Sequence, residues 1–112
     1  MGTKFNIIAV VGTTEVDLAP YPGGNATVPT GKTRNVYSWV LSNSSSASNT
    51  LTLRIYRGTT LEKSIPIAFG AYDTIDTVSD KESPILVVPS GRTLKAVASA
   101  ASITVLMTGE DK

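Results

Sequence analysis

The sequence contains neither cysteine nor histidine. Without cysteine the chain can form no disulfide, no thiolate nucleophile and no thiolate metal site. Without histidine it also lacks the commonest general base and the commonest metal ligand. Charged residues are scarce too, at 17% against about 25% in an average soluble protein. These absences exclude the usual catalytic centres, so we predict no enzyme, no cofactor and no metal site.

The charges that are present are balanced and dispersed. Ten basic and nine acidic residues give a net charge of +1 and form no basic stripe, so a nucleic-acid partner is not predicted. The longest apolar run is too short to span a membrane. The first residues lack the charged start and apolar core of a secretory signal. We expect a protein made in the cytoplasm that leaves the cell only as part of a larger assembly.

Apolar and polar residues alternate along most of the chain, with turn signals between the alternating segments. The clearest case is Thr50 to Arg57, where Leu51, Leu53 and Ile55 point one way. Such a pattern without a helical period predicts an all-β protein. For 112 residues we expect a single domain over 1–112, an antiparallel β-sandwich that is jelly-roll-like, with an immunoglobulin-like sandwich as the alternative. The expected strands are 4–11, 14–18, 34–43, 50–57, 61–69, 72–78, 85–88, 94–99 and 103–108.

Two of these strands carry more detailed expectations. In the strand from 34 to 43, Tyr37, Trp39 and Leu41 are assigned to one face and Val36 and Val40 to the other. In the strand from 61 to 69, a proline stands in the middle. Proline cannot donate to a strand ladder, so this strand should lie at an edge or contain a bulge.

One turn formula occurs twice, as Val28 to Thr33 and as Val88 to Thr93. Proline, a small residue and glycine in succession are typical of a β-turn. The first copy contains Gly31-Lys32-Thr33, the end of a phosphate-binding loop. That motif needs an earlier glycine where this chain has Ala26, and a following helix where a strand is expected. Two similar turns are therefore the favoured interpretation.

A few polar and aromatic residues were weighed as binding groups. Glu15 and Asp17 share a strand face and could ligate a hard cation, but two carboxylates on a strand more often form its solvent side. Tyr21 and Tyr56 are expected to be exposed, where they could join a protein interface or a glycan platform.

The sequence resembles small virion structural proteins of tailed phages over about residues 25 to 108. The shared pattern is a Val-Pro-x-Gly-Lys-Thr turn, a strand ending in Asn-Ser, a Ser/Ala-rich loop, and a closing turn, strand, Ala-Ser-Ala and strand. Residues 1–24 have no counterpart in that pattern. The matching segments are Thr27 to Thr33, Val36 to Ser45, Leu51 to Ile55, Ile85 to Ala96, Ala98 to Ala100 and Ile103 to Val105.

The resemblance implies a capsid decoration (cement) protein on the virion surface, commonly a homotrimer, that binds the major capsid protein and stabilises the shell. The alternative is a tail or fibre module that binds a host glycan or protein through the loop from Ser42 to Asn49; a cellular carbohydrate-binding or adhesion module is a third possibility. Residues 1–11 are a candidate N-terminal arm or strand, which as an arm would add a strand to a neighbour's sheet, and 109–112 are expected to be a free polar tail. The interface candidates are Phe5, Ile7, Tyr21 and Tyr56.

Overall fold

Strands account for all of the regular structure. The computed structural model describes residues 3–21, 24–79 and 83–112, and within these ranges it contains no helix. No helix able to cross a membrane is present in the described part of the chain. The strands are β1 (Thr3–Val11), β2 (Val16–Asp17), β3 (Arg34–Asn43), β4 (Asn49–Arg57), β5 (Thr60–Phe69), β6 (Thr74–Val78), β7 (Leu86–Val88), β8 (Thr93–Ala98) and β9 (Ile103–Asp111).

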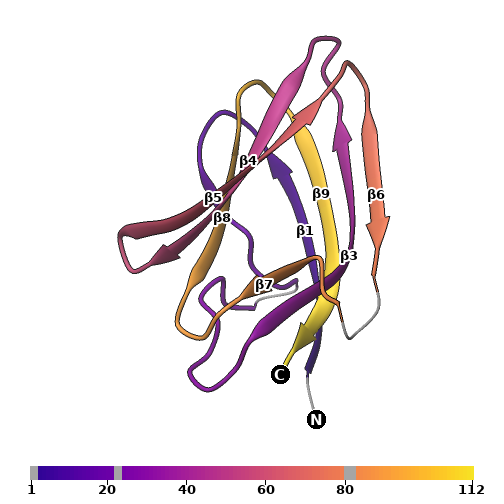
Figure 1. The fold of residues 1–112 in the computed structure, drawn as a ribbon. Helices are drawn as coiled ribbons and strands as arrows, with labels where there is room; N and C mark the ends of the chain where they lie inside the picture. The colour runs from indigo at the N-terminus through magenta and orange to yellow at the C-terminus, as the bar shows by residue number, and fades with distance from the viewer. Residues whose placement is uncertain (1–2, 22–23, 80–82) are drawn as a thin grey trace.

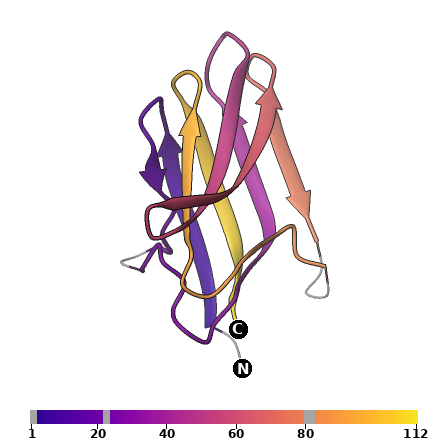
Figure 2. The ribbon, with the colours of Figure 1, turned by 60° about the vertical axis from the view of Figure 1, so that its left-hand side comes forward.

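The strands form two antiparallel sheets (Figure 1 and Figure 2). One has the order β1-β9-β3-β6, with the short β7 also paired to β3, and the other has the order β2-β8-β4-β5. The pairs are nested: β1 with β9, β2 with β8, β3 with β6, and β4 with β5. A long hairpin rolled into two sheets in this way is a jelly roll. The predicted all-β antiparallel sandwich is confirmed, and its topology is the jelly roll, not the immunoglobulin-like alternative.

Alternate residues of both sheets fill one core between the layers. Leu51, Leu53 and Ile55 of β4 are buried, as their alternation predicts. The proline-containing β5 lies at the edge of its sheet, as expected. The core consists of Phe5, Ile7, Val11, Leu18, Val28, Val36, Leu41, Leu51, Leu53, Ile55, Phe69, Leu86, Val88, Leu94, Ala96, Ala98, Ile103, Val105 and Met107.

A buried ion pair joins the start of β3 to the end of β9. The Arg34 side chain is 2% exposed, and its Nε and Nη2 atoms donate to the two carboxylate oxygens of Asp111 at 2.8 and 2.9 Å. Nη1 donates to the carbonyl oxygen of Asn25 at 3.0 Å. The guanidinium also lies 5.3 Å from the centroid of the Phe5 ring. Every part of this buried cation is therefore satisfied, which a buried charge requires.

Both copies of the repeated formula are β-turns, and they lie against each other. The Lys32 N–H donates to the Pro29 carbonyl at 3.1 Å, and the Arg92 N–H donates to the Pro89 carbonyl at 3.2 Å. The glycine of each turn has a positive φ, 83° and 75°, which glycine adopts without steric cost. The Ser90 hydroxyl accepts a hydrogen bond from the backbone of the first turn. A strand follows the first turn, so the phosphate-loop interpretation does not apply.

The described ends of the chain are part of the sheet, which corrects two expectations. Residues 3–11 pair along their whole length with β9, from Thr3 opposite Asp111 to Val11 opposite Ile103, so they are not a free arm. The expected tail at 109–112 belongs to β9 as far as Asp111, and the Lys112 backbone exchanges two hydrogen bonds with Thr33. Residues 1–2 of the expected arm, and 22–23 and 80–82 of two expected loops, lie outside the described residues.

We predict that replacing Asp111 with Ala lowers the free energy of unfolding by about 3 kcal/mol, because it leaves the Arg34 guanidinium buried without its carboxylate. Urea denaturation followed by tryptophan fluorescence measures the change. The control is Asp17→Ala, which removes the exposed ion pair with Lys95 and should cost less than about 1 kcal/mol. Equal effects of the two substitutions would contradict the prediction.

Candidate functional site

The outer face of the β1-β9-β3-β6 sheet carries a contiguous apolar patch. Strand register places Ile8 opposite Leu106, and Leu106 opposite Val40, in one row across three strands. Val10 follows on β1, two residues beyond Ile8. The side chains of Ile8, Val10 and Leu106 are 55%, 66% and 39% exposed, and Val40 is half-buried. We call these four residues the apolar patch.

The apolar patch is unusual for its position. The solvent face of an antiparallel sheet normally carries polar residues, and here one row across three strands, Ile8, Leu106 and Val40, is aliphatic, with Val10 beside it. Single exposed aliphatic side chains need no explanation, but a row of them marks a surface for contact with another molecule. The patch lies on rigid strands, so a partner would meet a preformed surface.

A β-bulge next to the apolar patch changes the direction of one aromatic side chain. The pairing of β3 with β9 shifts between Val36 and Ser38, which leaves Tyr37 without a register partner. The Tyr37 carbonyl accepts hydrogen bonds from the backbone N–H and the hydroxyl of Ser79, which hold the bulge in place. Opposite the bulge, a Cβ on Gly109 would lie 1.9 Å from the Asn35 carbonyl oxygen, so this close approach requires glycine.

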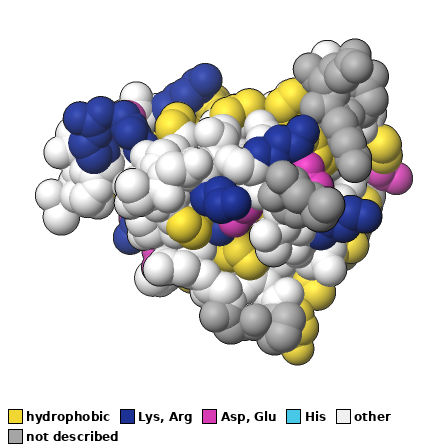
Figure 3. All heavy atoms as spheres, turned by 90° about the horizontal axis from the view of Figure 1, so that it is seen from below, with side chains coloured by type: hydrophobic (Ala, Val, Ile, Leu, Met, Phe, Trp, Pro, Cys, Tyr) yellow, Lys and Arg dark blue, Asp and Glu magenta, His cyan; other side chains and the backbone are white. Residues whose placement is uncertain are grey.

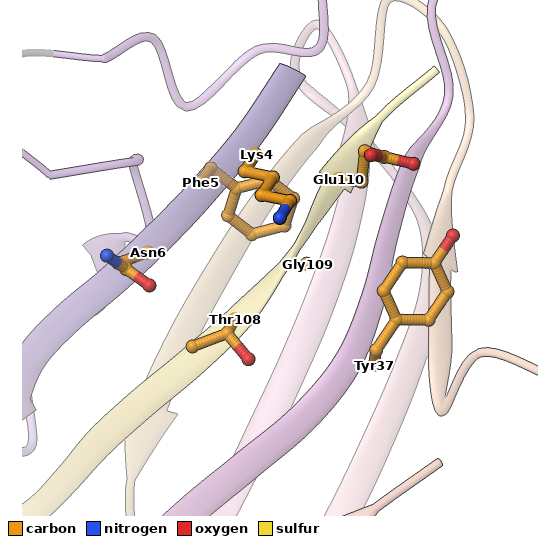
Figure 4. Close-up of a pocket in the computed structure, with 7 residues that line it drawn as sticks. All are labelled: Lys4, Phe5, Asn6, Tyr37, Thr108, Gly109 and Glu110. Atoms are coloured by element: carbon orange, nitrogen blue, oxygen red, sulfur yellow. The ribbon is translucent and has the colours of Figure 1, made fainter. Parts of the chain in front are cut away.

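The bulge and the glycine create a small cavity on the same sheet face, which we call the slot. Its volume is about 190 Å³, and it is lined by Lys4, Phe5, Asn6, Tyr37, Thr108, Gly109 and Glu110. Figure 4 shows Lys4 and Phe5 on one side of Gly109 and Tyr37 on the other, with the Glu110 carboxylate at one end. The Glu110 side chain is only 12% exposed, and its nearest cation is the Lys112 ammonium at 3.7 Å.

The outer face of the second sheet is different, because its charged side chains already have partners. The Glu15 carboxylate accepts hydrogen bonds from Arg54 at 2.8 Å and from the Tyr56 hydroxyl at 2.9 Å. The hydrogen bond from Arg54, assisted by the Tyr56 hydroxyl and the charges of Arg54 and Lys95, lowers the pKa of Glu15. Lys95 pairs with Asp17 at 3.3 Å. Glu15 and Asp17 are thus held in ion pairs, and the described residues contain no cluster of carboxylates that could hold a metal ion.

Basic side chains lie at the end of the sandwich that holds the described chain ends and the two β-turns at 28–33 and 88–93. Figure 3 views this end directly and shows several Lys and Arg side chains, some with acidic side chains beside them. Two of the arginines share one carboxylate: Arg57 and Arg92 both contact Glu62, at 3.2 and 2.9 Å. These contacts lower the pKa of Glu62, the hydrogen bond from Arg92 being the larger cause. A partner that docks at this end would meet positive charge.

Buried amides connect three of the loops at the opposite end. The side-chain amide of Asn43 donates to the carbonyls of Ala47 at 3.1 Å and Gly70 at 2.9 Å. That of Asn49 donates to the carbonyl of Ala100 at 2.8 Å. The Ser42–Asn49 segment, predicted to be a receptor-binding loop, is therefore fixed to the loops before β6 and before β9.

The structure separates the four predicted interface residues. Phe5 and Ile7 are 8% and 0% exposed and belong to the core, so Ile7 does not reach the surface and Phe5 reaches it only as a wall of the slot. Tyr21 is 63% exposed and lies beside β1, bridged to Asn6. Tyr56 is half-buried on the other sheet and occupied by its bond to Glu15. The structure does not bring the four together.

The apolar patch was not among the predicted interface residues, although Ile8 of the patch directly follows the predicted Ile7. Ile8 and Val10 alternate with Ile7 and Val11 in an unbroken apolar run. An apolar run of this kind means that both faces of the strand are apolar, and one of them faces outward if the strand covers only one core. The run was therefore the available signal. Leu106 offers the same signal between Val105 and Met107.

The fold and these surfaces define a class: a jelly roll with an exposed apolar patch and a slot on one sheet face. No protein-family model and no curated protein matches the sequence.

We predict that Glu15→Gln lowers stability at neutral pH but hardly at all in acid. The folded-state pKa of Glu15 is below its ordinary value of 4.5, so its contribution is present above that pH and is lost as the pH falls further. Urea denaturation of both proteins across a pH series measures the difference. Asp76→Asn, on exposed β6, is the control. A difference between wild type and Glu15→Gln that stays constant through the acid range would refute the prediction.

Proposed function

We propose that this chain is a virion structural protein, most specifically a capsid decoration protein that binds the major capsid protein on the outside of the shell. The observation that carries the proposal is the apolar patch, because it is an unpaired contact surface on a rigid sheet. The resemblance of the turn-and-strand pattern in the sequence to tailed-phage structural proteins suggests the particular partner. The jelly roll supports it as an analogy only, because this fold serves viral capsid proteins and lectins alike.

The size of the apolar patch suggests how such a protein would act. Full burial of one exposed aliphatic side chain contributes about 1.5–3 kcal/mol, so the patch by itself supports a modest affinity. A decoration protein is present in many copies, and linked copies multiply a modest affinity. Assembly as a homotrimer, which belongs to the proposal, would present three patches to neighbouring capsid subunits and bridge them.

The test uses the double variant Ile8→Thr/Leu106→Thr, which keeps strand-forming side chains but removes most of the exposed aliphatic surface. We expect it to lose at least about tenfold in affinity for capsid shells, since two buried aliphatic side chains are lost. Under the proposal, the shells are assembled from the major capsid protein of the virus that encodes this chain, and binding is measured by co-sedimentation. Val78→Thr, a 77% exposed valine on the same sheet but outside the patch, is the matched control.

Two results would overturn the proposal. Wild-type protein that fails to co-sediment with those shells would remove the capsid role. Binding that is unchanged in the double variant would remove the patch as the contact surface. Deletion of residues 1–11 is not a suitable test, because it removes β1 and with it an edge of the sheet.

A tail or fibre module that binds a host receptor is the second candidate, and the slot is the observation that favours it. The two roles differ in what loss of the protein does to the virion. Shells that rupture at lower temperature indicate decoration, whereas virions that stay stable but no longer adsorb to cells indicate a receptor-binding module.

A further inference from the structure

We infer that the slot binds the ring of a neutral saccharide. The inference concerns Lys4, Asn6, Tyr37, Thr108 and Glu110 around Gly109, and it does not depend on the capsid role proposed above. Its basis is the combination of a preformed cavity, one aromatic side chain turned outward, and a largely buried carboxylate whose hydrogen-bonding capacity is unused.

The size and rigidity of the slot suit a single ring. Sites for drug-sized ligands have volumes of roughly 300–1,000 Å³, and the slot has about 190 Å³. Its residues come from β1, β3 and β9, and β9 is hydrogen-bonded to β1 on one side and to β3 on the other. Side chains on paired strands are held more precisely than side chains on loops, so little order has to be gained on binding.

The walls of the slot are amphipathic in the way that a sugar ring is. A pyranose has a face of C–H groups and an edge of hydroxyls. Tyr37 offers an aromatic surface with a hydroxyl at its tip, and the bulge places it across Gly109 from Lys4 (Figure 4). Asn6 adds a side-chain amide, which donates and accepts hydrogen bonds, and Thr108 adds a hydroxyl whose remaining hydrogen-bonding capacity, beside its bond to Ser38, faces the slot. Together these groups can meet both surfaces of the ring.

Glu110 supplies hydrogen-bond acceptors to the slot. Its side chain is 12% exposed, and among the described residues no hydrogen bond reaches its carboxylate; the Lys112 ammonium is 3.7 Å away. A carboxylate has about four acceptor positions, and hydrogen bonds to it are roughly twice as strong as neutral ones. Ligand hydroxyls are donors of the right kind, because they can occupy these positions without bringing a second charge.

The charge of the rim favours a neutral ligand over an ionic one. Lys4 and Glu110 contribute one charge of each sign. A phosphate or a carboxylate sugar would be attracted by the Lys4 ammonium and repelled by the Glu110 carboxylate. An amino sugar would be attracted by Glu110 and repelled by Lys4. The Lys112 ammonium, 3.7 Å from the Glu110 carboxylate, partly offsets that negative charge. A neutral ring that carries hydroxyls is the ligand that meets no like charge at the rim, so we expect it to be preferred.

The experiment is a ¹⁵N–¹H correlation titration of the full chain with three neutral probes, the methyl pyranosides of glucose, galactose and mannose. We expect at least one probe to bind in the millimolar range and to shift the amide signals of residues 4–6, 37–38 and 108–110. N-acetylneuraminic acid, a carboxylate sugar, should bind more weakly than that probe.

The matched variants are Tyr37→Ala, Glu110→Gln and the control Tyr72→Ala, which removes an exposed tyrosine from the loop before β6. Tyr37→Ala should weaken binding by about tenfold, and Glu110→Gln by about threefold or more. Tyr72→Ala should bind as the wild type does. If Tyr37→Ala lowers the melting temperature, Tyr37→Phe and Glu110→Gln still test the slot, because both keep the shape of the side chain.

Three outcomes would overturn the inference: no localised shifts with any neutral probe, shifts that survive Glu110→Gln and Tyr37→Ala unchanged, or tighter binding of the carboxylate sugar. The apolar-patch variant Ile8→Thr/Leu106→Thr should still bind the probe. Failure of the capsid role and failure of the slot are therefore separable.

Discussion

The insertion of β9 between β1 and β3 is the contact on which the rest of the structure depends. β9 follows the other described strands in the sequence, so β1 and β3 are not joined in the larger sheet until β9 is in place. The bidentate bond between Arg34 and Asp111 fixes the register at the end of β9. The outward side chains of β9 and its two neighbours then form both the apolar patch and the slot, so the same three strands hold the fold and present its surfaces.

Features that depend on the local sequence were predictable. The alternation of Leu51, Leu53 and Ile55 gave the inward face of β4, and Pro66 identified β5 as an edge strand, because each follows from one strand's own geometry. The strand from 34 to 43 shows the limit. The bulge at Tyr37 changes the phase of alternation, so Val36 is buried on the same side as Leu41, opposite to the prediction. A bulge is set by the partner strand, and the partner is about 70 residues away.

The contact surfaces were less predictable than the fold for the same reason. Period-two alternation separates Ile7 from Ile8 but does not say which of two apolar faces meets the core, and Phe5 and Ile7, predicted for the interface, lie on the core face. The slot depends on the register of three strands and on the close approach of Asn35 to Gly109, which no single segment encodes. Long-range pairing therefore carries the information that alternation lacks.

Nested strand pairs form most easily from the inside outward. β4 and β5 are joined by two residues, whereas β1 and β9 are separated by most of the chain. The entropic cost of closing a loop rises with its length, so each inner pair shortens the loop that the next pair must close. Topologies dominated by such distant pairs fold slowly. Until β9 arrives, one side of β3 is an open strand edge that another chain can occupy, so the yield of refolded protein should fall as the concentration rises.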